Sequence, residues 1–141
     1  MATEEIKFLN VVKEVQIAAP ADVVFETVLE PHGPMKEMNM KLEPWPGGRW
    51  FRDLGNNTGH LWGHVQVIKP PKLLELVGPT MMSYPAISHI QYRLIEQPGG
   101  TLLKFTHRAI GLIEPEVEQG VNKGWGETLE QIRTAAEKKR G

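Results

Sequence analysis

The sequence contains no cysteine, no hydrophobic run long enough to cross a bilayer and no excess of charge of either sign. The lack of cysteine excludes disulfides, thiolate zinc sites and cysteine nucleophiles. The 16 basic and 17 acidic side chains give a formal net charge of -1, which argues against a nucleic-acid footprint and an electrostatic membrane anchor. A secretory signal peptide would begin with basic and then apolar residues, whereas the first ten residues include Glu4 and Glu5. The sequence therefore predicts a cytoplasmic protein that binds neither nucleic acid nor membranes.

Motifs that bind phosphates, cofactors or metals are also missing. The sequence has no Gly-rich phosphate loop, no Gly-x-Ser-x-Gly elbow and no His-Glu-x-x-His pair. The spacing of His60 and His64 would suit one metal ion on a helix, but we expect both residues on a strand. At about 3.3 Å per residue they would lie roughly 13 Å apart there, too far to share an ion. The sequence therefore predicts no metal site, no cofactor and no evident catalytic machinery.

Length and composition indicate a single domain that covers residues 1–141. A chain of this length with 40% hydrophobic residues buries a core without disulfides or a structural metal. Apolar and polar residues alternate over Phe8–Ala18, which predicts a half-buried strand. Pro20 is suited to open a helix after it, and Pro31 and Pro34 are suited to end that helix.

The segment that follows is predicted to be an antiparallel meander, because alternating apolar runs are separated by strong turn sequences. A hairpin closed at the Gly-Asn-Asn-Thr turn pairs Trp50 with Gly63 on one face. It also pairs Phe51 with Trp62 on the opposite face and directs Arg52 inward. We therefore expect two exposed aromatic rings and one inward-facing cation in this hairpin.

The next turn predicts a further strand pairing. The Lys-Pro-Pro-Lys turn sets Val65 near Leu76 and Val67 near Leu74, provided that a small bulge around Ile68 absorbs the prolines.

The Gln-Pro-Gly-Gly turn predicts the last hairpin of the meander. It pairs Ile90 with His107 and Tyr92 with Phe105 on an apolar face. His107 is therefore expected to point inward, among apolar side chains.

The last segment changes to helical periodicity. Its apolar positions are Val121, Trp125, Leu129, Ile132 and Ala136. Gly120, Gly124 and Gly126 each weaken a helix by about 1 kcal/mol relative to alanine. We therefore expect a long amphipathic helix that begins, over Glu114–Gly126, as a bent or loose turn. Tight packing or a mobile entrance would explain the three glycines.

Five short motifs occur in series along nearly the whole chain. They are Ile17–Phe25 (IAAPADVVF), Pro46–Trp50 (PGGRW), Gly63–Pro71 (GHVQVIKPP), Gly99–Leu102 (GGTL) and the pair Gly124–Trp125. In this order they resemble the heat-shock-protein-90 ATPase activator homologue family, which belongs to the START-like, or SRPBCC, helix-grip superfamily. The resemblance implies an α+β helix-grip fold, in which a curved antiparallel sheet wraps around a long C-terminal helix and two short helices follow the first strand.

The resemblance also implies a cavity between sheet and helix, because a strongly bent sheet leaves space that the helix does not fill. The aromatic residues expected to line it are Trp45, Trp50, Tyr92, Phe105 and Trp125. The methionines expected to supply adaptable walls or a lid are Met35, Met38, Met40, Met81 and Met82. Arg52, Tyr92 and His107 would give the cavity its polar groups, which suits a molecule with an apolar body and one acidic or polar end.

Arg52 and His107 each allow more than one interpretation. His107 is either a hydrogen-bonded core residue, the leading interpretation, or an acid/base group, since histidine titrates near neutral pH. Arg52 either reaches the rim of the sheet, pairs with an acidic side chain such as Glu37 or Glu43, or clamps an anionic ligand.

Three functions are compatible with these features. The leading hypothesis is binding of a small hydrophobic or amphipathic molecule without catalysis. The second is a cyclase, dehydratase or hydrolase of the kind found among superfamily relatives, with His107 acting beside Arg52 or Tyr92. The third, suggested by the family's name, is a co-chaperone-like interaction module. Self-association through the outward pair Phe51 and Trp62 is a further hypothesis, because exposed aromatics favour a partner.

Overall fold

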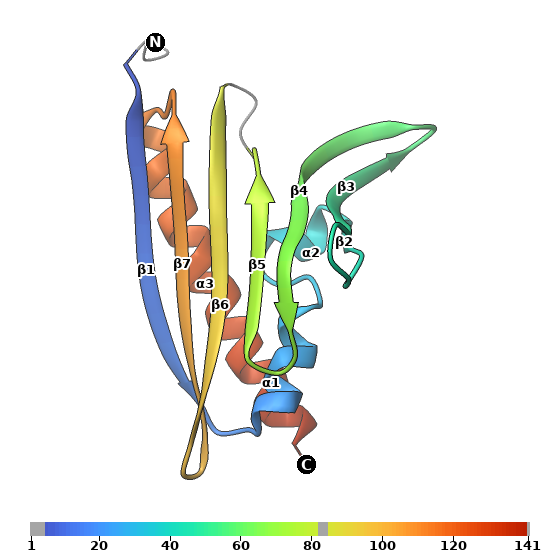
Figure 1. Ribbon diagram of the computed structural model, residues 1–141, viewed down its shortest axis with the longest axis vertical. Helices are drawn as coiled ribbons and strands as arrows, with labels where there is room; N and C mark the ends of the chain where they lie inside the picture. Colours follow the sequence, from blue (N-terminus) through green and yellow to red (C-terminus); the bar gives the residue numbers. More distant parts are fainter. Residues whose placement is uncertain (1–4, 82–84, 141) are drawn as a thin grey trace.

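One antiparallel sheet and one long helix form the framework of the protein (Figure 1). The computed structural model describes residues 5–81 and 85–140. The strands are β1 (Lys7–Ile17), β2 (Met40–Leu42), β3 (Arg49–Gly55), β4 (Thr58–Lys69), β5 (Leu73–Gly78), β6 (Ala86–Gln97) and β7 (Gly100–Gly111). The helices are α1 (Ala21–Val28), α2 (Pro34–Glu37) and α3 (Pro115–Lys139).

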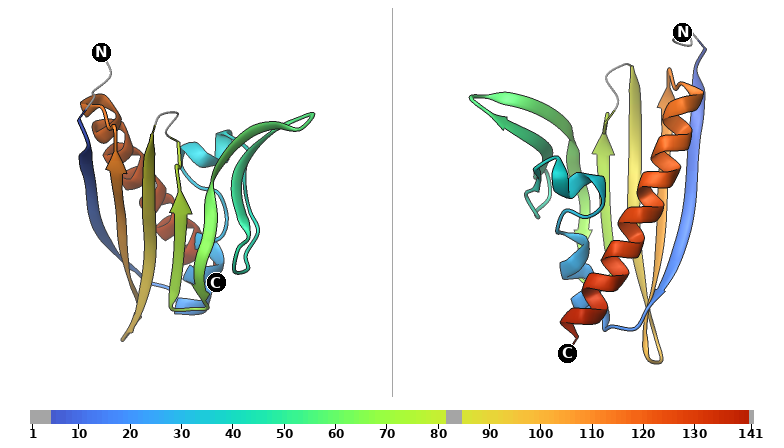
Figure 2. Two further views of the ribbon diagram at one scale, coloured as in Figure 1. Left: turned by 45° about the horizontal axis from the view of Figure 1, so that its top comes forward. Right: turned by 180° about the vertical axis from the view of Figure 1, so that it is seen from behind.

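The seven strands form a single sheet in the order β1-β7-β6-β5-β4-β3-β2. Helix α3 crosses one face of this sheet, and α1 and α2 lie beside it on the same side (Figure 2). The far part of the β3–β4 hairpin curves away from the other strands (Figure 1). The predicted helix-grip architecture, including the two short helices after the first strand, is therefore confirmed.

The β6–β7 hairpin has the predicted register. Ile90 pairs with His107, and Tyr92 pairs with Phe105. All four side chains are buried. The turn sequence and the strict alternation of apolar residues fix this register, since a slip by one residue would expose the whole apolar face.

The predicted register of the β3–β4 hairpin is wrong beyond its first pair. Trp50 does lie opposite Gly63, but the next pair is Phe51 with Leu61. Trp62 is the extra residue of a β-bulge, and a bulge changes which face the following side chains occupy. Trp62 therefore points inward, where it is 3% exposed and contacts Trp50 edge to face at 5.1 Å between ring centroids.

The bulge also removes the outward aromatic pair on which the hypothesis of self-association rested. Trp62 is buried, and Phe51 is half-buried beneath Arg49, whose guanidinium carbon lies 4.5 Å from the centre of the ring. On the outer face of the sheet, the exposed apolar cluster is instead Phe8, Ile87 and Ile110, which lie in one row across β1, β7 and β6.

The pairing of β4 with β5 is correct in part. Val65 faces Leu76 as predicted. Val67 faces Glu75 instead of Leu74, because the bulge lies between Val65 and Val67 and not around Ile68.

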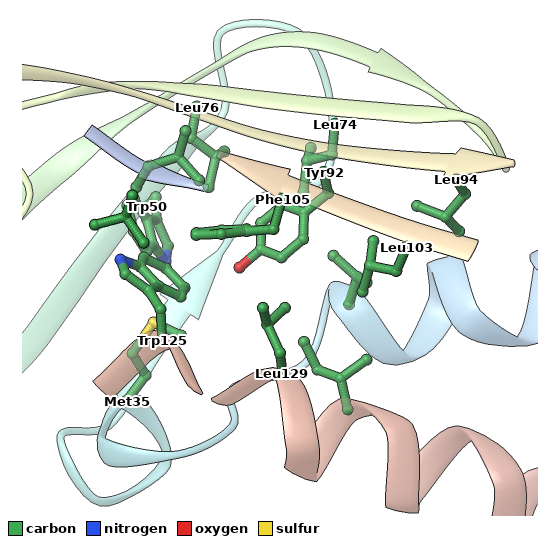
Figure 3. Packing of buried hydrophobic residues seen from close by; sticks show 14 of the residues in the cluster. Met35, Trp50, Leu74, Leu76, Tyr92, Leu94, Leu103, Phe105, Trp125 and Leu129 are labelled. Carbon is green, nitrogen blue, oxygen red and sulfur yellow. The ribbon is translucent and has the colours of Figure 1, made fainter. Parts of the chain in front are cut away.

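The core lies between the sheet and α3. The apolar positions predicted for the helix, Val121, Trp125, Leu129, Ile132 and Ala136, are all buried. Figure 3 shows Tyr92, Phe105 and Leu103 of the sheet pointing toward the side chains of α3. Burial of each large side chain contributes roughly 1.5–3 kcal/mol, so this layer holds the helix on the sheet.

The start of α3 is a regular helix and not the bent or loose turn that its glycines suggested. Gly120 and Gly124 have little in contact with them: a β-carbon at Gly120 would meet nothing within 4 Å, and one at Gly124 would meet only Cγ of Pro34 at 3.9 Å. These two glycines therefore leave space beside the helix. Neither of them marks a tight contact.

Helix α2 is held against α3 at Gly33. This residue has a φ of +61°, and a β-carbon there would collide with the hydroxyl oxygen of Thr128 on α3. Its backbone N–H donates to Oε1 of Gln131, also on α3, at 2.7 Å. Only glycine combines this backbone conformation with this close approach, so Gly33 determines where α2 meets the helix.

Replacement of Gly120 by alanine is expected to raise the free energy of unfolding by about 1 kcal/mol, because alanine favours the helix and its methyl group meets open space. The matched change Gly33→Ala is expected to lower it, because the backbone there is left-handed and Thr128 blocks the methyl group. Urea unfolding of both variants beside the unmodified protein measures the two shifts. A loss of stability in Gly120→Ala would contradict the open space assigned to this position.

Candidate functional site

A pocket of about 320 Å³ lies between α2, β4 and the first half of α3. We call it the α2–α3 pocket. The residues that line it are Pro34, Met35, Met38, Trp62, Met81, Val117, Gly120, Val121, Gly124, Trp125 and Thr128. Gly120 is exposed to solvent, so the pocket is open at the surface along the first turns of α3.

The pocket follows from the sequence of α3. Residues three and four apart lie on one face of a helix, so Val117, Gly120, Val121, Gly124 and Thr128 form a single strip. Two of these five positions carry no side chain. Trp62 of β4, Met35 of α2 and the adjoining Met38 line the pocket opposite this strip, and the two missing side chains leave space between them and α3.

The lining is uncharged among the residues that the structure describes. Its only hydroxyl group, that of Thr128, donates to the backbone oxygen of Gly124 at 2.8 Å. The indole N–H of Trp125 is likewise engaged, with Nδ1 of His107 at 2.9 Å. The pocket therefore presents apolar surface to an occupant and no ionic group.

Of the aromatic residues predicted to line a cavity, only Trp125 lies in this pocket. Trp50 and Tyr92 border a second space of about 30 Å³ on the inner face of the sheet, which is about the volume of one water molecule. Phe105 is fully buried in the core. Trp45 is 56% exposed and does not line the pocket, because it lies in the loop between β2 and β3 and points to solvent.

The predicted methionines line both spaces. Met38 and Met81 line the α2–α3 pocket, Met40 borders the inner space, and Met35 contacts both. Met82 lies outside the described residues.

Arg52 faces inward as predicted, since it pairs with the buried Met40 across β2 and β3. It does not line the α2–α3 pocket. Its Nε atom is buried without a hydrogen-bond partner. Glu43 is engaged elsewhere: Arg49 donates to both oxygens of its carboxylate and lowers the pKa of that group to about 2.

His107 is enclosed by the core and has no access to the pocket. Its Nδ1 accepts from the indole of Trp125, so the proton of the neutral ring is on Nε2, which donates to Oγ of Ser88 at 2.9 Å. Burial lowers the pKa of the ring to about 4. Both nitrogens are occupied and the ring is neutral at pH 7, which agrees with a hydrogen-bonded core residue.

Sequence reasoning missed Trp62 and the strip on α3. Trp62 was assigned to the outer face because the bulge leaves no trace in the turn sequence. The strip did have a signal, because glycines four residues apart on a helix remove side chains from one face. The sequence offered tight packing or a mobile entrance as explanations of these glycines, and the structure shows open space beside Gly120 and Gly124 in a regular helix.

Two further observations concern metal binding and membrane crossing. Within residues 5–81 and 85–140, no group of three or more histidines and carboxylates is placed to hold a metal ion. Over the same residues, no helix combines the length and the apolar character needed to cross a bilayer.

The buried His107 gives a specific pH dependence of stability. Its pKa is about 4 in the folded protein and 6.5 in the unfolded chain, so the unfolded chain binds the proton first as the pH falls. The free energy of unfolding is therefore expected to decrease between pH 6.5 and pH 4, by roughly 3 kcal/mol from this group at 1.36 kcal/mol per unit. Urea unfolding at several pH values in that range, with the non-titrating variant His107→Asn as reference, measures the difference. If the free energy of unfolding falls equally with pH in both proteins, the titration of His107 does not cause the decrease.

Comparison with solved structures supports the fold. An uncharacterised protein from Rhizobium leguminosarum is 20% identical with a TM-score of 0.73, over 95% of this chain and 97% of that one. The Staphylococcus aureus protein SA2116, of unknown function, is 13% identical with a TM-score of 0.70, over 97% and 98% of the two chains. The di-domain ARO/CYC StfQ from the steffimycin biosynthetic pathway is 11% identical with a TM-score of 0.65, over 94% of this chain and 51% of that one.

At these identities the similarity establishes the fold alone. No curated protein is a significant match to the chain. The family comparison is more specific, because residues 18–137 match the model described as "Activator of Hsp90 ATPase homolog 1-like protein". The match covers α1, α2, the strands β2 to β7 and all but the last residues of α3, and it begins directly after β1. The chain therefore belongs to the Activator of Hsp90 ATPase homolog 1-like family.

Proposed function

We propose that this protein binds a small, uncharged and largely apolar molecule in the α2–α3 pocket. The observation that carries the proposal is the lining: an open pocket of about 320 Å³ surrounded by apolar side chains and two glycines. Ligand pockets in proteins have volumes from about 300 to 1,000 Å³ and are predominantly apolar, so this one suits a compact ligand.

The lining argues for an uncharged ligand. A charged group moved from water into an apolar site loses its hydration, and it is tolerated only beside an opposite charge. Arg52 and His107, the two groups that would favour an acidic end, do not line the pocket. Of the molecule with one acidic or polar end that the sequence predicted, the proposal keeps the neutral form and drops the acidic one.

The wider comparison agrees with a small-molecule role. StfQ, which shares the fold, is an ARO/CYC protein of a biosynthetic pathway. A reaction that uses His107 with Arg52 or Tyr92 is not proposed, because none of the three side chains lines the pocket and His107 is fully buried. The activation of the Hsp90 ATPase in the family's name belongs to the protein for which the family is named.

Two probes that differ in charge test the proposal. We expect 2-naphthol, which is neutral at pH 7, to bind at least tenfold more tightly than 2-naphthoate, because the lining has no cation to pair with the carboxylate. Isothermal titration calorimetry measures both affinities. Failure of 2-naphthol to bind, or equal affinity for the two probes, would contradict the proposal.

A matched pair of variants locates the binding site. Gly124→Leu directs a side chain into the pocket and is expected to reduce the affinity for 2-naphthol at least tenfold. Gly126→Leu makes the same change two residues later on α3, outside the pocket, where a β-carbon meets only Nζ of Lys13 at 3.9 Å. It is expected to keep the affinity of the unmodified protein. Equal affinity of both variants for the probe would place binding elsewhere.

A further inference from the structure

A chain of buried hydrogen bonds runs behind the α2–α3 pocket. The indole of Trp125 on α3 donates to Nδ1 of His107 on β7, and Nε2 of His107 donates to Oγ of Ser88 on β6, both at 2.9 Å. The hydroxyl of Thr80 lies 3.4 Å from the same Ser88 oxygen. Each of these four residues is at most 3% exposed.

The chain is connected to three residues that line the pocket. Its first member, Trp125, is one of them. The backbone N–H of Thr80 donates to the backbone oxygen of Trp62, the second, at 2.8 Å. The third is Met81, the neighbour of Thr80 in the sequence, whose sulfur lies 3.2 Å from the Thr80 hydroxyl oxygen. One side of the pocket is thus backed by a single hydrogen-bonded unit.

His107 holds the orientation of the Trp125 ring. The indole lies 4.4 Å from Phe105 between ring centroids and meets Tyr92 edge to face at 6.3 Å. These contacts limit the position of the ring, but only His107 gives its N–H an acceptor. A buried donor that loses its acceptor is unfavourable, so without His107 the ring would turn to find another partner and would change the shape of the pocket.

We infer that His107 is a positioning residue that sets the width of the α2–α3 pocket through Trp125, and so determines which neutral ligands fit. This inference rests on the proposed function, since it concerns the same pocket. His107 does not contact the ligand. Its role is carried by the indole, which forms a wall of the pocket on one side and is fixed by the imidazole on the other.

The first measurement needs no ligand. The indole N–H resonance of Trp125 in the ¹⁵N-labelled protein, assigned by its loss in Trp125→Phe, reports the bond to His107. We expect His107→Leu to shift this resonance and to speed its exchange with water. We expect His107→Asn, whose side-chain oxygen replaces Nδ1 as the acceptor, to keep it close to its original position. An unchanged resonance in His107→Leu would overturn the inference.

The second measurement is ligand selectivity. The affinities for flat 2-naphthol and bulky 1-adamantanol, both neutral, give a ratio that depends on the width of the pocket. We expect His107→Leu to change this ratio at least fivefold and His107→Asn to change it less than twofold. In a Trp125→Phe background, His107→Leu is expected to leave the ratio unchanged, because residues that act through one another are not additive.

The outcomes distinguish failure of the inference about His107 from failure of the proposed function. An equal effect of His107→Leu with and without the Trp125 indole would mean that His107 acts only through general stability, and it would overturn the inference. If the unmodified protein binds neither probe while the Trp125 resonance responds as expected, the proposed function fails, and with it the assignment of selectivity. Should His107→Leu not fold, Ser88→Ala removes the Nε2 partner instead and is expected to shift the resonance and the ratio in the same direction.

Discussion

The contact between the Trp125 indole and the inner face of the sheet is the interaction on which the rest of the structure depends. Trp125 lies near the middle of α3 and packs against Phe105 at 4.4 Å between ring centroids. Its N–H bonds to His107, so the same ring is fixed by apolar packing and by a directional bond. Apolar packing brings the indole close to the sheet, whereas the directional hydrogen bond also sets the orientation of its ring. Trp125 therefore determines how α3 is rotated about its axis on the sheet.

The rotation of α3 decides which of its faces meets the core and which meets the α2–α3 pocket. Leu129, Ile132 and Ala136 follow Trp125 on the helix and are 4% exposed or less. There the side chains of the helix are buried against those of the sheet, as Figure 3 shows for Leu129. Before Trp125 the facing positions include Gly120 and Gly124, and the space is open. One helix therefore closes the core with its second half and leaves a pocket with its first half.

The sequence was sufficient for the fold and for one hairpin, and insufficient for the position of the pocket. The β6–β7 register follows from a turn and from alternation, both of which are local signals. The β3–β4 bulge has no such signal: it places Trp62 against Trp50 within one hairpin, and neither the turn sequence nor the apolar alternation indicates it. Aromatic residues were then assigned to the pocket because large rings suit a cavity wall, although most of them fill the core.

Several departures from local rules lie in or next to the lining of the α2–α3 pocket, while others, such as the unpartnered Nε of Arg52 and the bulge between Val65 and Val67, lie elsewhere. Gly120 and Gly124 weaken the helix that carries them, and the bulge at Trp62 interrupts a strand pairing. The indole N–H of Trp62 is buried without a partner. Thr80, whose backbone is bonded to Trp62, has a φ of +58°, an unfavourable conformation for a β-branched side chain.

Each of these features costs stability, and none of them is needed to hold the sheet on α3, because the buried side chains of the β6–β7 hairpin and of the second half of α3 supply that contact. In natural proteins, departures of this kind occur mainly where a site requires them. The departures that adjoin Trp125 are therefore an argument, independent of the pocket's volume, that the packing beside the first half of α3 does not serve stability alone.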